Sequence, residues 1–313
     1  MKQFVVKIEN LVKRYKDVPA VDHFNLIIEK GEILGLLGPN GSGKTTTINC
    51  LLSLLQFDKG LIEIFGKPMS PDSYDIKRNI GIISQNVAVF EDLTVSENVD
   101  YFCGLYVRDK QKRKSLVKEA IEFVGLEDYM KFYPSKLSGG LLRRLNIACG
   151  IAHKPKLIIM DEPTVAVDPQ SRNRILKGIQ SLNENGATII YTSHYMEEVE
   201  QICSRIIIMD KGRNLAEGTT EELKLMIKTG ETIRIELLDL PKEHIENIKN
   251  LKHVFSVEFE DALLTVRCRR GSHNLVNLLN YLNEHNLGCG RVFSELPTLN
   301  DVFLEITGKQ LRD

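Results

Sequence analysis

The sequence predicts an α/β protein with two domains, and three observations support this prediction. Residues 33–37 form an apolar run of buried-strand length, followed by a glycine-rich loop and by residues 46–55, whose apolar positions recur at helical spacing. Residues 156–162 form a second buried-strand pattern that ends in two carboxylates. Residues 229–313 change character and alternate short strand and helix patterns. A chain of 313 residues is long enough for two domains.

The composition is that of a globular protein and excludes several classes. Hydrophobic residues make up 42% of the chain and charged residues 27%, with no low-complexity tract that would indicate disorder. The net charge of -1, with Lys and Arg spread along the whole length, gives no electrostatic footprint for nucleic acid. No run approaches the roughly 18 apolar residues of a membrane helix, and the N-terminus has no apolar signal region. We therefore do not expect this chain to cross a bilayer by itself.

The cysteines give no sign of a metal site. They lie far apart, without a C-x-x-C pair or a histidine in ligand spacing. We expect buried thiols in a reducing cytosol. The six positions are Cys50, Cys103, Cys149, Cys203, Cys268 and Cys289.

The glycine-rich loop has the spacing of a phosphate-binding loop. A strand before G-x-x-x-x-G-K-[ST] and a helix after it is the context in which backbone N–H groups face a β-phosphate. Lys44 is then expected to reach the β- and γ-oxygens, and the Thr45 hydroxyl to ligate Mg²⁺. The alternative, a glycine turn without a ligand, gives no reason for Lys-Thr at that offset. The loop residues are Gly38, Pro39, Asn40, Gly41, Ser42, Gly43, Lys44, Thr45 and Thr46.

Two carboxylates end the second strand pattern. A strand that brings Asp161 beside the loop supplies the acidic group for Mg²⁺, directly or through water. Glu162 then lies where an attacking water would be, and we expect it to orient that water and accept its proton. A pair of solvated carboxylates at a strand end is the alternative, and their occurrence together with Lys44 argues against it.

A second anion-binding corner is predicted about a hundred residues after the first. Its small residues precede a run that reads as the start of a helix, where free N–H groups and the positive end of the helix dipole point the same way. The corner consists of Leu137, Ser138, Gly139 and Gly140.

The ordered set of motifs resembles the ATP-binding-cassette (ABC) proteins. GPNGSGKTT, LSGG, LIIMDEP, the Asp168 of VAVDPQSR and the His194 of YTSHYMEE occur in that family's order and spacing. The chain most resembles the separate nucleotide-binding subunit of bacterial exporters of the daunorubicin-resistance and nodulation-exporter type. The resemblance implies a P-loop NTPase cassette over residues 1–228, with a RecA-like core and a helical subdomain at about residues 90–150. Residues 229–313 would form a smaller accessory domain.

The resemblance also implies roles for matched residues. Tyr15 would stack on adenine, with a Tyr half-buried on a strand as the alternative. Gln85 would sense Mg²⁺ and the attacking water and link to a membrane partner. Asp168 would contact the partner across a dimer. His194, at the carboxyl end of a predicted strand, would touch the γ-phosphate, with a structural histidine as the alternative.

The implied ligands are ATP and Mg²⁺, and the implied partners are a second copy and an integral-membrane permease. In this family two subunits pack head to tail, so that the Ser138 corner of one chain covers the γ-phosphate on the Lys44 loop of the other. The helical subdomain would form a groove for the permease. Leu93, Phe102 and Tyr106 are candidate contacts there, or else subdomain core.

Three positions depart from the family's pattern. Leu141 and Leu142 stand where many relatives carry Gln or Met followed by a polar or basic residue, and Ala166 stands where Gly is usual. Because the phosphate contacts come from Ser138 and the two glycines after it, we expect the site to stay competent. The effect of Leu141 on the rate stays open.

Residues 229–313 predict the order β-α-β-β-α-β, which is ferredoxin-like. Family members use this region for regulation or dimer contacts, and fold alone does not choose between them. Four histidines there lack ligand spacing, so we expect them in packing or at the surface: His244, His253, His273 and His285. The predicted strands and helices are residues 232–237, 244–251, 254–260, 263–268, 274–284 and 290–293, followed by a helix at 299–306.

The leading interpretation is an ATPase subunit that drives an exporter, cytoplasmic and held at the inner face of the membrane by its permease. The alternative is a soluble ABC ATPase that acts on DNA or ribosomes, a class that usually carries coiled-coil or zinc insertions or two cassettes. An importer ATPase is a third reading. The transported substrate is chosen mostly by the permease, so this sequence does not specify it.

Overall fold

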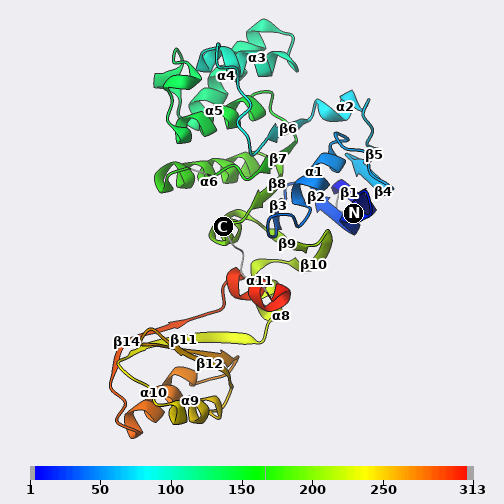
Figure 1. Ribbon diagram of the computed structural model, residues 1–313. Coiled ribbons are helices and arrows are strands. Elements are labelled where there is room, and N and C mark those ends of the chain that lie inside the picture. Colours follow the sequence, from blue (N-terminus) through cyan, green and yellow to red (C-terminus); the bar gives the residue numbers. More distant parts are fainter. Residues whose placement is uncertain (1–3, 166, 309–313) are drawn as a thin grey trace. The chain divides into compact units, whose positions relative to one another are not determined.

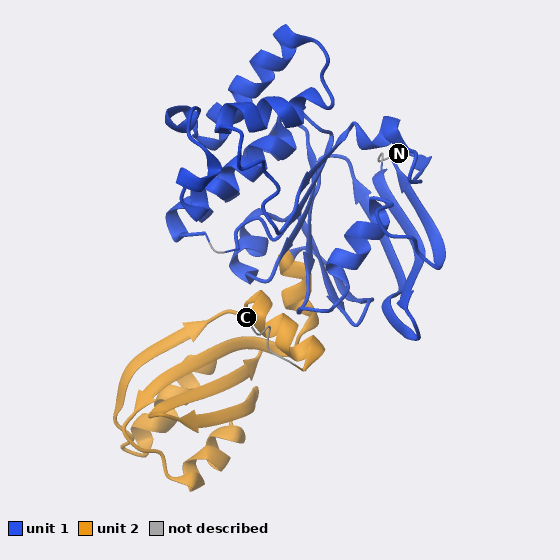
Figure 2. Cartoon of the chain, turned by 45° about the horizontal axis from the view of Figure 1, so that its top comes forward, with its two compact units in different colours: residues 1–219, 312–313 blue, residues 220–311 orange. Residues whose placement is uncertain are grey.

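The computed structural model of the chain describes residues 4–165 and 167–308. The chain forms two compact units, residues up to 219 and residues 220–311, which Figure 2 colours separately. This boundary precedes position 228 because helix α8 (Thr220–Met226) packs on α11 (Leu299–Thr307) within the second unit. The Glu305 carboxylate of α11 also accepts backbone N–H groups of Lys228 and Thr229.

A six-stranded sheet forms the centre of the first unit (Figure 1). Its strand order is β10-β9-β3-β8-β7-β6, in which β10 is antiparallel to β9 and all other neighbours are parallel. Every residue of β3, β7 and β8 is buried, as expected of parallel strands covered on both faces. The strands are β3 (Ile33–Leu37), β6 (Ile80–Ile83), β7 (Leu157–Asp161), β8 (Thr188–Ser193), β9 (Arg205–Asp210) and β10 (Arg213–Gly218).

A second, antiparallel sheet shares its core with the first. Its order is β2-β1-β4-β5, from β1 (Phe4–Tyr15), β2 (Val18–Glu29), β4 (Lys59–Ile64) and β5 (Lys67–Pro68). Ile8 and Ile62 of this sheet belong to the same buried cluster as Leu34 and Leu36 of β3. Helix α1 (Lys44–Leu51) adds Ile48 to that cluster, so the helix after the glycine loop is anchored in the core.

Three helices form a layer of their own, α3 (Val95–Gly104), α4 (Lys110–Val124) and α5 (Gly139–Ile151) (Figure 1). A capping box starts α3, since Thr94 and Glu97 each accept the backbone N–H of the other. Helix α5 packs on β6 and on α6 (Pro169–Glu184), which joins this layer to the central sheet. The remaining helices of the unit are α2 (Tyr74–Lys77) and α7 (Met196–Ile202).

The second unit has the predicted β-α-β-β-α-β order. Its sheet runs β12-β13-β11-β14, with all neighbours antiparallel. Ile248 and Leu278, on the two helices, pack on Ile233 and Ile235 of β11, so the helices share one core with the sheet. The elements are β11 (Thr229–Leu237), α9 (Lys242–Lys249), β12 (Val254–Glu260), β13 (Leu263–Arg269), α10 (Asn274–Glu284) and β14 (Cys289–Glu295).

The structure bears on two predictions, one about membrane helices and one about the cysteines. In residues 4–165 and 167–308, no helix is long and apolar enough to cross a membrane. All six cysteines are free thiols, and most are buried as expected. Cys203 is half-buried, and Cys289 lies exposed at the start of β14, an edge strand whose side chains have little cover.

Candidate functional site

The glycine loop follows β3 at the carboxyl edge of the parallel sheet. Gly43 has a φ of 105°, and a Cβ there would lie 2.4 Å from the backbone oxygen of Ala20. A Cβ on Gly38 would lie 2.2 Å from the backbone oxygen of Met209. Gly41, with a φ of 79°, has open space where a Cβ would point. The loop therefore needs glycine for its own path at two positions and leaves room for a ligand at the third.

Lys44 is 5% exposed and folds back over this loop. Its Nζ donates to the backbone oxygens of Gly38 (2.7 Å) and Pro39 (3.3 Å). Burial lowers the pKa of the Lys44 ammonium, and the nearby Glu162 and Asp161 carboxylates oppose that shift. The lysine is thus held beside the cradle by weak carbonyl acceptors, which anionic phosphate oxygens can replace with stronger ones.

Oxygen ligands for a small divalent cation gather at the end of β7. The Thr45 hydroxyl donates to Oδ2 of Asp161 at 3.2 Å, and the Thr192 hydroxyl donates to Oδ1 at 2.6 Å. The parallel register that pairs Asp161 with Thr192 fixes this contact. A carboxylate beside a hydroxyl, next to a phosphate cradle, fits Mg²⁺, which keeps several waters and binds through one or two carboxylates and phosphates.

Two side chains converge on one oxygen, Oε2 of Glu162. The Gln85 amide donates to it at 3.0 Å, and Nδ1 of His194 lies 3.5 Å away. The Glu162 backbone has a φ of 49°, in the left-handed region, and its N–H contacts the Thr192 hydroxyl at 2.9 Å. A buried carboxylate held this way can accept a proton from a water in the cradle.

Two residues of α5 that the sequence analysis missed hold the Gln85 segment in place. The Arg143 guanidinium is buried and donates to the backbone oxygens of Ser84 (2.9 Å) and Gln85 (2.7 Å). Asn146 accepts the N–H of Ala88 at 3.1 Å. A charged residue buried on the apolar face of a helix was the available signal, because such a residue needs a partner.

The second anion-binding corner lies at the start of α5. Ser138 caps the helix, accepting the Leu141 N–H at 3.3 Å, and Leu137 precedes it in extended conformation. Figure 1 shows α5 in the helical layer, away from α1 and its loop. The helix start predicted from the sequence is therefore present in the helical layer, and its binding of an anion stays a prediction.

Asp168 lies beside this corner. It caps α6 by accepting the Ser171 N–H at 2.9 Å, and these contacts with Ser171 lower the pKa of the Asp168 carboxyl. A Cβ on Gly140 would lie 2.9 Å from the Ser171 hydroxyl and 3.1 Å from Oδ2 of Asp168, so glycine is required for the approach. Ala166, named above as a departure, lies outside the described residues.

Tyr15 ends β1 and pairs with Val18 across the turn to β2. Its side chain is 52% exposed, and Nζ of Lys13 lies 5.4 Å from the ring centroid. A side chain that is half-exposed at the end of a strand fits both the packing alternative and stacking on a planar ligand. Stacking on adenine stays a prediction.

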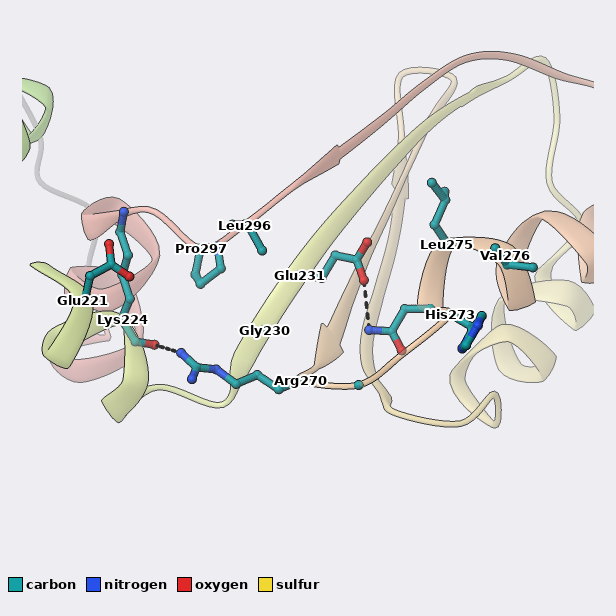
Figure 3. Close-up of a pocket in the computed structure, with 12 residues that line it drawn as sticks. Glu221, Lys224, Gly230, Glu231, Arg270, His273, Leu275, Val276, Leu296 and Pro297 are labelled. Atoms are coloured by element: carbon teal, nitrogen blue, oxygen red, sulfur yellow. Dashed lines mark hydrogen bonds between the residues drawn. The ribbon is translucent and has the colours of Figure 1, made fainter.

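The second unit contains a groove of about 560 Å³ between α8, α10 and β11 (Figure 3). Its charges have both signs, and those of Arg270 and Glu231 are already engaged. Arg270 donates to the Lys224 backbone oxygen at 2.9 Å, and Glu231 accepts from Asn274 at 2.9 Å and from Ser294 at 2.6 Å. Reacting groups do not converge there as they do at Glu162.

Two family models match the chain. The model described as "ABC transporter" matches residues 21–165. The model described as "ATP-binding protein DrrA1-3-like, C-terminal domain" matches residues 218–307. The second match begins two residues before the second structural unit, at 220.

Relatives match over the whole length. The linearmycin resistance ATP-binding protein LnrL of Bacillus subtilis is 37% identical over 99% of this chain and 100% of its own length. The daunorubicin resistance ATP-binding protein DrrA3 of Streptomyces coeruleorubidus is 31% identical over 100% of this chain and 98% of its own. Among solved structures, the dimeric post-hydrolysis state of the ATP-binding cassette MJ0796 bound to ADP and Pi matches with a TM-score of 0.63. It is 28% identical and covers 68% of this chain and 98% of that one.

Proposed function

Because this chain belongs to the ATP-binding proteins of ABC transporters, we propose that it powers export through a separately encoded membrane permease. It is an ABC ATPase of the exporter and resistance type. One observation carries the proposal most directly: Gln85 and His194, from segments far apart in the sequence, meet at Oε2 of Glu162 beside the Lys44 loop. The names of the relatives refer to resistance and export, which favours transport over action on DNA or ribosomes.

We assign the reaction to these groups. The triphosphate of ATP lies on loop residues 38–46, where Lys44 leaves its carbonyl partners for the β- and γ-oxygens. Thr45 and Asp161 would hold Mg²⁺, which would supply positive charge to neutralise the phosphate oxygens. Glu162 orients the attacking water and takes its proton. Gln85 orients the same water, and His194 donates to the γ-phosphate.

The second anion-binding corner serves the ATP of a partner copy. Ser138, Gly139 and Gly140 present the N-terminus of α5, and Asp168 lies next to them. In a head-to-tail dimer this corner covers the γ-phosphate on the partner's loop. A helix terminus facing an anion contributes up to roughly 2 kcal/mol when partly buried, and only while the γ-phosphate is present. Hydrolysis therefore weakens the dimer.

The permease docks on the helical layer, at the inner face of the membrane. Phe90, Tyr101 and Phe102 form an aromatic cluster next to the Gln85 segment, and Phe90 and Tyr101 are 45% and 46% exposed. Beside it lies a groove of about 570 Å³ with a mostly apolar lining that includes Leu93. Phe102 of this cluster was in the predicted set, whereas Phe90 and Tyr101 were not. Leu93 and Phe102 are half-buried, and Tyr106 stacks on His153.

The dimer is tested with Glu162→Gln, which keeps the shape of the side chain and removes the base. With Mg-ATP the variant should elute as a dimer in size-exclusion chromatography, and with Mg-ADP as the smaller species. Elution as a monomer with Mg-ATP would contradict the shared site.

The corner is tested with Ser138→Arg, and Ser135→Arg is a matched control because Ser135 is also exposed and lies one turn earlier. Ser138→Arg should keep ATP binding and lose turnover, whereas Ser135→Arg should keep both. Wild-type turnover in Ser138→Arg would show that the corner takes no part in the reaction.

Permease docking is tested by co-purification with the membrane protein of the transporter. Tyr101→Glu should reduce recovery of the complex, whereas Tyr74→Glu should not. Tyr74 is 65% exposed and lies outside the helical layer, so it controls for the charge. Equal recovery of both variants would place the docking surface elsewhere.

A further inference from the structure

Glu198 on α7 is a buried carboxylate that the reaction above does not use. It is 3% exposed. Its Oε2 accepts hydroxyl hydrogen bonds from Thr164 (2.8 Å), Tyr191 (2.6 Å) and Ser193 (2.8 Å). Its Oε1 lies 3.3 Å from Nε of Arg172, an ion-pair contact without hydrogen-bond geometry. A buried carboxylate is costly unless it is paired, so this arrangement calls for a reason.

Three of the four partners of Glu198 lie close in sequence to a residue of the site. Thr164 comes two residues after Glu162, and Ser193 comes directly before His194. Arg172 lies on the first turn of α6, which Asp168 caps. One side chain therefore joins the segments that carry the proposed base, the proposed γ-phosphate contact and the residue proposed to cross the dimer.

The contacts fix the turn that carries His194 from both sides. The Ser193 hydroxyl donates to Glu198 and accepts the N–H of Tyr195 at 2.9 Å. The Arg172 guanidinium lies 4.4 Å from the Tyr195 ring centroid, and the His194 ring lies 4.2 Å from the same ring. His194 is thus held between two residues whose positions both depend on the buried carboxylate.

The same carboxylate supports Glu162 from the downstream side. Glu162 has left-handed backbone, which a residue with a Cβ adopts only when its surroundings hold it there. Thr192 holds its N–H, and the Thr164 hydroxyl holds the following residues against Glu198.

We propose that Glu198 is a positioning residue that holds His194 and Glu162 in register for hydrolysis. The inference rests on the proposed roles of those two residues. A carboxylate oxygen has the lone pairs for several hydroxyl donors, while the second oxygen faces a cation. An amide cannot serve both sides, because its NH₂ group must point either at the hydroxyls or at the Arg172 guanidinium.

The test compares Glu198→Gln with Glu197→Gln in the full chain. Glu197 is the neighbouring residue on the same helix and is exposed, so its variant controls for the lost charge. Glu198→Gln should lower kcat about 10- to 100-fold, because a misplacement of about 1 Å costs up to about 10²-fold. The affinity for ATP should change by less than about threefold, because the Lys44 loop lies outside the network. Wild-type kcat in Glu198→Gln would overturn the inference.

A double-mutant cycle separates positioning from a general loss of stability. In a His194→Ala background, Glu198→Gln should lower kcat by a clearly smaller factor than in wild type, because one of the two groups being positioned is already absent. If the two effects multiply, Glu198 acts independently of His194 and the inference is wrong. If His194→Ala alone keeps wild-type kcat, the proposed role of His194 fails and takes this inference with it.

A variant with a smaller change guards against misfolding of Glu198→Gln. Ser193→Ala removes one of the hydroxyl donors to Oε2 and the acceptor of the Tyr195 N–H, and it leaves the carboxylate with its other partners. It should lower kcat in the wild-type background and add little to His194→Ala. Equal loss in both backgrounds contradicts the inference even if Glu198→Gln does not fold.

Discussion

His153 makes the stability of the first unit depend on acid. Its ring stacks on Tyr106 at a centroid distance of 3.9 Å, and its Nε2 lies 3.2 Å from the backbone oxygen of Ile80. Because a carbonyl only accepts, Nε2 carries the proton, and added acid must protonate Nδ1. That atom is buried and has no hydrogen-bond partner among the described residues. Burial lowers the pKa of His153 from 6.5 to about 4.

The sign of the effect follows from these two pKa values. Between pH 6.5 and 4 the unfolded chain binds a proton at this position and the folded chain does not, so the free energy of unfolding falls as the pH falls. The stability is fully present above about pH 6.5. The loss amounts to about 2 kcal/mol at pH 5 and about 3 kcal/mol below pH 4.

Urea unfolding at pH 7 and pH 5 measures this loss of stability. The probe is hydrogen exchange of peptides from β7, so that only the first unit is observed. His153→Phe keeps a ring against Tyr106 and does not titrate. This variant should be less stable than wild type at pH 7, because one hydrogen bond is gone. Between pH 7 and pH 5 its free energy of unfolding should fall by about 2 kcal/mol less than that of wild type. His23→Gln, at an exposed position, should behave as wild type. Equal losses in wild type and His153→Phe would refute the reasoning.

Three further predictions concern the site. Arg143→Met should lower kcat about tenfold or more with little change in ATP affinity, because the backbone oxygens of Ser84 and Gln85 each lose one charged hydrogen bond, and Arg143→Lys should recover part of the rate in a steady-state ATPase assay. Gly43→Ala should weaken ATP binding at least about tenfold in equilibrium dialysis, while Gly31→Ala, also at positive φ but with open space, should not. Glu162→Gly should be more stable than Glu162→Ala by about 0.5 to 1 kcal/mol in urea unfolding, because only glycine adopts its left-handed backbone without strain; the reverse order would contradict that strain.

The sequence predicted those parts of the site that come as short contiguous motifs. The loop around Lys44 and the acids at the end of β7 lie next to apolar runs, whose length and order predicted a parallel sheet. Since the carboxyl ends of parallel strands meet at one edge, Asp161 and His194 could be placed together without coordinates. The strands and helices of residues 229–313 were predicted because each is a short contiguous segment with its own alternation of apolar and polar residues.

The contacts of Arg143 and Glu198 could not be predicted in this way. Each depends on partners from elements far apart in the chain, and no periodicity specifies which donor meets which acceptor. Arg143 lies on a face of α5 that the spacing of apolar residues predicts to be buried. Glu198 directly follows the exposed Glu197, so the sequence alone does not show which of the two glutamates is buried. Only the packing of α5 on β6 and of α7 on β8 determines their partners.

Several buried polar residues of the first unit lie at the candidate active site. Its buried polar residues include Lys44, Asp161, Glu162, Thr192 and Glu198, at or just behind the carboxyl edge of β3, β7 and β8. Buried charges are weak evidence for stability, since well-packed apolar groups in their place are often as stable or more so. The apolar cluster shared by the two sheets must therefore supply the stability that this edge does not. Polar residues at buried positions are expected at a functional site. The reason is that reactive groups must be held in place where water cannot form hydrogen bonds with them.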